Sequence, residues 1–169
     1  MKLKISILNK SHDRKGFNCG KRVLDNYLQL QVSQDIKKKL SVCFVLVDES
    51  NKVKGYYTLS NSSILHSDMP SSLSKKIPDS YKDIPVTLLG RLAIDKTVFR
   101  KGNGEYLLMD ALRESYSVSK KVIGSMAVVV DPIDEEAAFF YEKYDFVRLP
   151  NSGKLFLPMN VISKLFPNI

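Results

Sequence analysis

The chain has 169 residues, a formal net charge of +8, 44% apolar residues and 26% charged residues. This length and balance are typical of a soluble globular protein, and we predict a single domain over residues 1–169. No apolar run reaches the roughly 20 residues of a membrane helix, and two cysteines are too few for a disulfide framework, so a reduced, cytoplasmic setting is expected. The excess of basic residues favours partners that carry phosphate, such as nucleic acid or a phosphorylated cofactor, although a lysine-rich solvated surface accounts for it equally well.

The first half of the chain predicts short strands and one helix. Leu3, Ile5 and Ile7 alternate with polar residues, as in a half-buried strand. Apolar runs on either side of the polar residues 48–51 indicate a hairpin. Residues 20–39 predict a helix that ends in three lysines. The inward stripe of that helix would consist of Val23, Leu24, Tyr27, Leu28 and Gln31. The Pro- and Ser-containing segment from about His66 to Pro85 predicts a loop that covers a site, with one short helix.

The centre of the chain predicts a strand, a polar turn and a helix. Residues 86–94 are an apolar run, and residues 95–101 form the turn. Gly102 and Gly104 then precede a helix that ends near Lys121. The inward positions of this helix are Leu107, Leu108, Ala111, Leu112, Ser115 and Val118. Free backbone N–H groups and the positive end of the helix dipole suit a ligand that contains phosphate, and Arg100 and Lys101 add positive charge.

The last third of the chain predicts a buried strand over residues 125–131 and then a helix. Asp131 would cap this helix, Pro132 would be its first residue, and it would end near Lys143. A hairpin and a short C-terminal helix follow. This order of elements predicts an α/β fold whose mixed sheet carries helices on both faces.

Several chemistries are excluded by the motifs that the chain lacks. It has neither a P-loop nor the glycine pattern of a dinucleotide site. His12 and His66 lie far from each other and from the cysteines, so a metal site is not expected. Cys19 and Cys43 are interpreted as structural, with Cys19 the better candidate for a reactive thiol.

The chain contains two motifs, LLGRLAID followed by FRKGNGEYLL and, further along, DEEAAFFYEKYDF, and together these resemble the GNAT family of acetyl-CoA-dependent N-acetyltransferases. The first, LLGRLAID followed by FRKGNGEYLL, resembles the coenzyme-A signature of that family, and Gly102 and Gly104 match its glycines. Phe99 stands where glutamine or arginine is usual. The second, DEEAAFFYEKYDF, resembles a motif in which Tyr141 matches the family's tyrosine, Asp134 replaces an asparagine and Asp145 replaces a glycine. The resemblance implies a GNAT-like fold.

Four further segments, which begin at Phe17, Lys54, Pro85 and Lys154, extend the resemblance to one subgroup, the GNAT toxins of bacterial toxin–antitoxin pairs. FNCGKRVLDNYL, KGYYTLS, PVTLLGRLAID and KLFLPM are similar to segments of that subgroup, so nearly the whole chain from Phe17 to Met159 is covered. The resemblance implies acetylation of the α-amino group of aminoacyl-tRNA, which blocks translation. It also implies a ribbon-helix-helix antitoxin as partner and no membrane association, and it leaves a homodimer open.

The resemblance also implies roles for single residues. Tyr141 would be the general acid that protonates the coenzyme-A thiolate, because a phenol with a pKa of about 10 stays protonated at neutral pH. No metal is implied. The acetyl-CoA cosubstrate would be bound by Leu92, Ala93, Ile94, Phe99, Arg100, Lys101, Gly102, Asn103, Gly104, Glu105 and Asp134.

Basic residues are candidates for contacts to RNA. Arg91 lies in an apolar strand, where it would either form a structural ion pair or contact the acceptor substrate. Phosphate contacts are predicted for Lys37, Lys38, Lys39, Lys75 and Lys76, with Lys82 and Lys96 as further candidates.

Two other functions fit the same sequence. One is a GNAT enzyme that acetylates a small-molecule or protein amine, for which the coenzyme site would be the same. The other is a non-catalytic module that binds nucleic acid through its basic face, to which the departure at Phe99 points.

Overall fold

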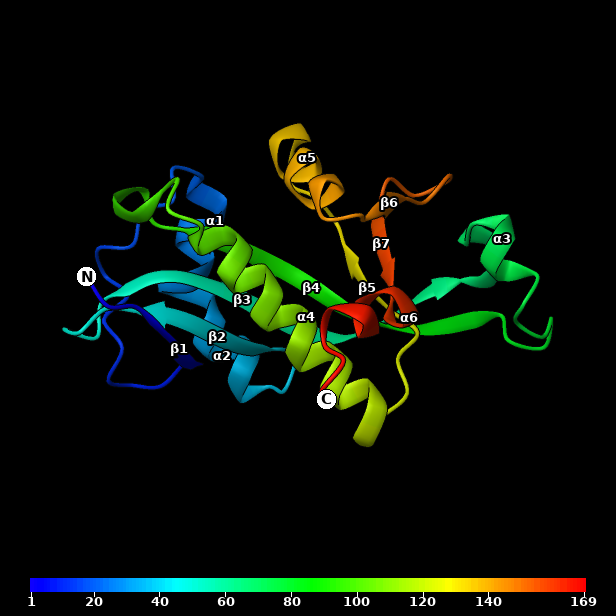
Figure 1. The fold of residues 1–169 in the computed structure, drawn as a ribbon. Coiled ribbons are helices and arrows are strands. Elements are labelled where there is room, and N and C mark those ends of the chain that lie inside the picture. Colours follow the sequence, from blue (N-terminus) through cyan, green and yellow to red (C-terminus); the bar gives the residue numbers. More distant parts are fainter. The chain divides into compact units, whose positions relative to one another are not determined.

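A computed structural model describes all residues from Met1 to Ile169 and has a mixed α/β fold (Figure 1). Seven strands form one sheet in the order β1-β2-β3-β4-β5-β7-β6. The pair β4–β5 is parallel, whereas β1–β2, β2–β3, β5–β7 and β6–β7 are antiparallel. This topology confirms the predicted mixed sheet. The strands are β1 Lys4–Ile7, β2 Val42–Val47, β3 Val53–Leu65, β4 Asp83–Ile94, β5 Ala127–Val130, β6 Val147–Arg148 and β7 Leu155–Pro158.

The helices lie close to the predicted positions, and the long central helix agrees with its predicted C-terminus at Lys121. They are α1 Arg22–Asn26, α2 Val32–Lys37, α3 Ser71–Ser74, α4 Asn103–Lys121, α5 Glu135–Lys143 and α6 Met159–Ile162. A π-helical turn, Tyr27–Gln31, joins α1 to α2. Short 3-10 turns occupy His66–Asp68, Lys96–Val98 and Ser163–Leu165. No helix has the length and apolar character that a membrane crossing requires.

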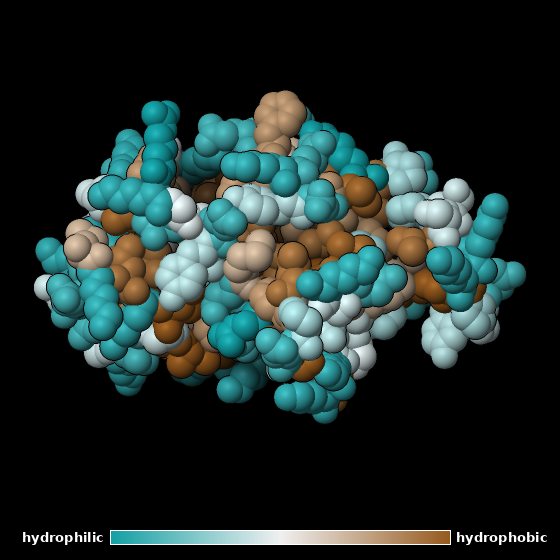
Figure 2. Space-filling model, viewed as in Figure 1, coloured by the Kyte–Doolittle hydropathy of each residue, from teal (hydrophilic) through white to brown (hydrophobic).

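The chain divides into two compact units. The first unit comprises Met1–Ser60 and Gly90–Ala111, and the second comprises Asn61–Leu89 and Leu112–Ile169. A single domain over the whole chain remains a prediction. In the space-filling view, hydrophilic side chains cover much of the end at which α1 and the N-terminal loops lie in Figure 1 (Figure 2).

Two adjacent tyrosines of β3 show how helices cover both faces of the sheet in the first unit. Consecutive strand residues point to opposite faces. The Tyr56 ring packs against Phe17, 5.6 Å between ring centroids, and its hydroxyl donates to the Leu24 carbonyl of α1 at 2.7 Å. The Tyr57 hydroxyl donates to Asp110 Oδ2 of α4, also at 2.7 Å. The segment with α1 therefore covers one face and the first half of α4 the other, as predicted.

The predicted stripe of the first helix is wrong at two positions. Val23 is 60% exposed and Gln31 is also exposed, whereas Tyr27, Leu28 and Val32 are buried. The π-helical turn explains the exchange of Gln31 for Val32, because its i→i+5 hydrogen bonds hold more residues per turn than an α-helix and rotate the following residues to another face. Val23 lies before this turn, and the turn does not explain its exposure.

The second unit is built around β5, whose four residues are all buried. Its apolar core consists of Ile64, Met69, Ile84, Val86, Ala127, Val129, Leu149 and Phe156. The predicted loop before β4 contains the short helix α3. The His66 imidazole fixes this loop, because its Nε2 lies 2.8 Å from the Ser74 carbonyl oxygen and its Nδ1 lies 3.0 Å from the Tyr81 carbonyl oxygen. Of the inward positions predicted for α4, only Val118 is wrong, because it is 41% exposed.

The predicted start of α5 is also wrong. The cap is Asp134, whose Oδ1 accepts from the Ala137 N–H at 2.8 Å, and not Asp131. Asp131 lies just after β5 and forms an ion pair with Lys154 at 3.3 Å. Both aspartates are capable caps by composition, and the end of the strand leaves only the second at the start of the helix.

Candidate active site

The strand predicted to hold the coenzyme arm packs tightly against β3 in the first unit. Ala93 is buried, while Leu92 and Ile94 are half-buried. Gly55 of β3 permits this close approach, because a Cβ there would lie 2.9 Å from Ile94 Cδ1 and 2.9 Å from Leu107 Cδ1 of α4. Gly55 thus sets the position of β4 and of the start of α4 relative to each other.

The turn after β4 is fixed by the buried carboxylate of Asp95. Its Oδ1 accepts from the Thr97 N–H at 2.9 Å and the Thr97 hydroxyl at 2.6 Å, and its Oδ2 accepts from the Asn18 N–H at 2.8 Å. Burial alone would raise the pKa of Asp95, but the hydrogen bonds from Thr97 and Asn18 outweigh it, so the pKa lies below its usual value. Asp95 is therefore a capping residue that is already fully engaged, and it is not available as a base.

The loop that follows leads into an open helix N-terminus. Arg100 and Gly102 both have a positive φ, 59° and 79°, which reverses the chain direction before α4. Glycine suits this conformation at position 102, and the space around its missing side chain is empty. The backbone N–H groups of the first helical residues, 103–105, have no acceptors within the helix. Such a turn can bind phosphate oxygens.

The side chains around this turn are largely accessible. Phe99 is 45% exposed, and Arg100, Lys101 and Glu105 are exposed as well. Asn103 is half-buried, and its amide nitrogen donates to the Val98 carbonyl at 3.0 Å, which ties the helix start to the preceding turn. The structure thus brings the predicted coenzyme residues from 92 to 105 together in one strand–turn–helix unit.

Arg91 does not form the structural ion pair that was one of its two predicted roles. Its guanidinium carbon lies 3.4 Å from the centroid of the Tyr27 ring, a cation–π contact. The Tyr27 hydroxyl in turn donates to Asp35 Oδ2 at 2.8 Å, and its ring stacks on Tyr56 with centroids 6.3 Å apart. Tyr27 was not predicted as a site residue, since nothing in the local sequence indicates a contact with a distant strand.

Tyr141 lies on α5 in the second unit and is 6% exposed. Its ring packs edge-on against Phe140 and Phe146, each at 5.3 Å between centroids. Burial raises the pKa of the Tyr141 phenol above its usual value. The hydroxyl therefore keeps its proton at neutral pH even more firmly than a free tyrosine.

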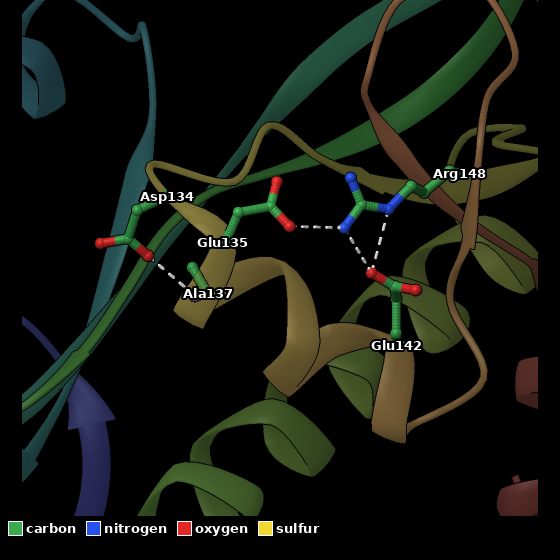
Figure 3. A network of polar contacts seen from close by, with 5 residues as sticks. All are labelled: Asp134, Glu135, Ala137, Glu142 and Arg148. Atoms are coloured by element: carbon green, nitrogen blue, oxygen red, sulfur yellow. Dashed lines mark hydrogen bonds and ion pairs between the residues drawn. The ribbon is translucent and has the colours of Figure 1, made fainter.

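Polar contacts hold α5 at both ends (Figure 3). Asp134, predicted to bind the coenzyme, caps the helix through Ala137. Arg148 of β6 bridges the two ends, with Nη2 3.1 Å from Glu135 Oε2 and 2.7 Å from Glu142 Oε1. The helix that carries Tyr141 is thus tied to the neighbouring hairpin.

The lysines predicted to contact RNA are exposed. Lys37, Lys38 and Lys39 lie at the end of α2 in the first unit, and Lys75 and Lys76 follow α3 in the second. Their positions are compatible with phosphate contacts, which remain a prediction.

Neither cysteine is suited to nucleophilic catalysis. Burial raises the pKa of Cys19 to about 11 and that of Cys43 to about 12, so both thiols stay protonated at neutral pH. No group of His, Cys, Asp or Glu side chains could hold a metal ion.

Comparison with known proteins identifies relatives along nearly the whole chain, although no family model matches it. The chain is 32% identical over 143 residues to the tRNA-acetylating toxin of Mycobacterium tuberculosis, and the match covers 85% of this chain and 83% of that protein. A tyrosine-to-phenylalanine mutant of KacT has a TM-score of 0.91 at 34% identity, with 98% of this chain and 100% of that chain covered. AtaT complexed with acetyl-methionyl-tRNAfMet has a TM-score of 0.89 at 33% identity, with 98% and 99% covered. Other similar structures contain AtaT with acetyl-CoA or with its antitoxin AtaR.

Proposed function

The chain belongs to the GNAT-fold toxins of toxin–antitoxin systems, and on this premise we propose that it is an acetyl-CoA-dependent N-acetyltransferase that acetylates the α-amino group of aminoacyl-tRNA and so blocks translation. The observation that carries the proposal is a relationship above 30% identity that extends over most of both chains. The open helix start after β4 supports it, because this is the local structure that a coenzyme-A pyrophosphate needs.

In this mechanism the first unit binds the coenzyme. The backbone N–H groups at residues 103–105 would donate to the pyrophosphate, and Arg100 and Lys101 would add charge. They would take over the role of the polar residue that Phe99 replaces. Backbone groups of Leu92, Ala93 and Ile94 would pair with the pantetheine arm. A backbone N–H of this strand would polarise the thioester carbonyl.

The reaction exchanges a C–S bond for a C–N bond. The neutral α-amine attacks the thioester carbon, the coenzyme-A thiolate leaves, and one N–H proton must end on that sulfur. Tyr141 would donate its phenolic proton to the thiolate. A buried phenol with a raised pKa cannot hold the resulting negative charge, so it must regain a proton from the acetylated nitrogen in the same step. Tyr141 thereby relays one proton from nitrogen to sulfur.

The proposal includes a partner and a compartment. An antitoxin of the ribbon-helix-helix class would bind and neutralise the enzyme, in line with the AtaT–AtaR and KacT complexes among the relatives. Aminoacyl-tRNA is a cytoplasmic substrate, so the enzyme would act in the cytoplasm.

The test is acetyl transfer to a pool of aminoacyl-tRNA by the purified wild-type protein, followed by the same assay with Tyr141→Phe. We expect acetylated aminoacyl-tRNA from the wild type and a fall in kcat of roughly 10²–10⁴-fold in the variant, the usual contribution of a general acid. Tyr81→Phe, which changes a 56% exposed tyrosine, is the matched control and should behave as wild type.

Two results would contradict parts of the proposal. If the wild-type protein acetylates a small amine but leaves aminoacyl-tRNA unmodified, the assignment of the acceptor is wrong. If Tyr141→Phe acetylates aminoacyl-tRNA at the wild-type rate, the role of Tyr141 is wrong while the enzyme class stands.

A further inference from the structure

A polar cavity of about 510 Å³ lies in the first unit, beside the loop that leads into α1. Its volume falls within the range of roughly 300–1,000 Å³ that is typical of sites for small ligands or parts of larger ones.

Three cations from separate segments line this cavity. Lys15 belongs to the loop before α1, Arg22 is the first residue of α1, and Lys96 begins the 3-10 turn after β4. All three side chains are exposed, and none forms an ion pair. The only carboxylate in the lining is that of Asp25, which already accepts from the Cys19 N–H at 2.8 Å. Three cations and one carboxylate leave a formal charge of +2.

The cavity wall is held in place by hydrogen bonds that do not involve the charged groups of these three side chains. Asp95 Oδ2 accepts from the Asn18 N–H at 2.8 Å, and the Lys96 N–H donates to the Asn18 carbonyl at 2.9 Å. The Gln29 amide donates to the Phe17 carbonyl at 2.9 Å. The loop that carries Lys15 is therefore cross-linked to the π-helical turn and to the turn after β4 that carries Lys96, and a ligand does not have to order it.

The lining favours phosphate over a nucleobase. The aromatic residue in the lining is Phe17, but it is only 3% exposed because its ring packs against Tyr56. A base would find no accessible aromatic surface on which to stack. Long cationic side chains, in contrast, bind phosphate oxygens irrespective of sequence.

We propose that this cavity is a contact site for the phosphate backbone of the tRNA substrate, with Lys15, Arg22 and Lys96 as the binding residues. The proposal rests on the proposed function, which supplies the polyanionic substrate. Coenzyme A also carries phosphate, and the experiment separates the two sources.

The experiment measures binding of deacylated bulk tRNA by fluorescence anisotropy, at salt concentrations from about 50 to 200 mM. The variants are Lys15→Gln, Arg22→Gln, Lys96→Gln and the triple combination. We expect each single variant to bind tRNA about fivefold more weakly and to reduce the steepness of log K against log salt by about 0.7–0.9, which corresponds to one lost phosphate contact. Lys2→Gln removes the same charge from an exposed position outside the cavity and should bind like wild type.

Acetyl-CoA binding by calorimetry completes the test, with thermal unfolding as a check on folding. Unchanged acetyl-CoA affinity in the triple variant, together with weaker tRNA binding, supports the proposal. Weaker acetyl-CoA binding with intact tRNA binding assigns the cavity to the coenzyme and overturns the proposal, as does a triple variant that binds tRNA like wild type. Because deacylated tRNA is the probe, a wild type that binds it but acetylates no aminoacyl-tRNA would refute the proposed function and leave the cavity test decisive.

Discussion

The two helices that follow the parallel strands β4 and β5 begin in opposite ways. The start of α4 is open, since Gly102 has no side chain to occupy the first N–H groups, and Arg100 and Lys101 bring positive charge. The start of α5 is closed, because the Asp134 carboxylate accepts from Ala137 and two glutamates follow in the first turn. Both helices have the same dipole, so the capping residue decides which of them can accept a phosphate.

The closed helix, α5, is suited to a different role, the positioning of a side chain. Its C-terminus is closed as well, because the Phe146 N–H donates to the Tyr141 carbonyl at 3.3 Å across Asp145, whose φ of 71° is left-handed. Capped at both ends and bridged by Arg148, α5 is suited to hold the Tyr141 side chain in one orientation. In the proposed mechanism, binding of the coenzyme and placement of the acid would thus be separated between two helices.

The largest effect on acetyl-CoA binding is expected when the open start of α4 is made to resemble the closed start of α5. Gly102→Asp places a carboxylate where the pyrophosphate would bind, and we expect acetyl-CoA to bind roughly 100-fold more weakly, as for one repulsive charge a few ångströms away at a partly exposed position. Gly102→Asn is the matched control, because asparagine tolerates a positive φ and is uncharged. Calorimetry measures both affinities. Equal losses of acetyl-CoA affinity in the two variants would show that the presence of a side chain, and not its charge, prevents binding at this turn.

The converse change opens the closed helix. Asp134→Ala removes the cap, and we expect the free energy of unfolding to fall by about 1 kcal/mol. Asp134→Ser restores an acceptor and should recover most of that loss in urea denaturation. Asp134 was also predicted to bind the coenzyme. If Asp134→Ser is stable but binds acetyl-CoA less tightly than wild type, the carboxylate contributes to binding in addition to capping.

The C-terminus of α5 offers a smaller, stabilising change. Asp145 occupies a left-handed position for which glycine is the usual residue, and its negative charge lies at the unfavourable end of the helix dipole. We expect Asp145→Gly to raise the free energy of unfolding by about 0.5 kcal/mol, since relief of strain exceeds the added flexibility of the unfolded chain. Asp145→Asn removes the charge and keeps a side chain of similar size, so it separates the effect of the charge from that of backbone strain. A destabilised Asp145→Gly variant would mean that the aspartate side chain makes a contact worth more than the strain.

Local patterns in the sequence predict where the open helix α4 begins, but they do not predict where the closed helix α5 begins. The run from Val86 to Ile94, the basic turn and Gly102 predict the unit with α4 because each signal is local and all agree. Asp131 and Asp134 are both good caps, and only the end of β5 decides between them.

Long-range packing explains the other differences from prediction. The cation–π contact joins Arg91 of β4 to Tyr27, which lies in the π-helical turn 64 positions earlier in the chain, and hydrophobic periodicity within one helix cannot predict such a contact. The cavity lined by Lys15, Arg22 and Lys96 has the same origin. Its three cations come from segments that only the folded chain brings together.

The smallest effect concerns pH and the environment of Tyr141. Because burial raises the pKa of this phenol, the protonated acid persists, and we expect kcat to show no falling alkaline limb from Tyr141 below a pH of about 10. An alkaline limb that begins near pH 9 in the wild type and is absent from Tyr141→Phe would contradict this.

The raised pKa of the Tyr141 phenol also makes the free energy of unfolding depend on pH. The stabilisation by the neutral, buried phenol is complete below the pKa of an unfolded tyrosine, about 10, and is lost as pH rises from there toward the higher pKa of the folded state. Cys19 and Cys43, with pKa values raised to about 11 and about 12, act in the same direction. The loss of unfolding free energy between pH 8 and pH 10.5, roughly the window that these reference values define, should therefore be smaller in Tyr141→Phe than in the wild type. The two thiols are present in both proteins, so the difference isolates Tyr141. Equal losses would mean that the hydroxyl is solvated and that α5 does not bury its acid.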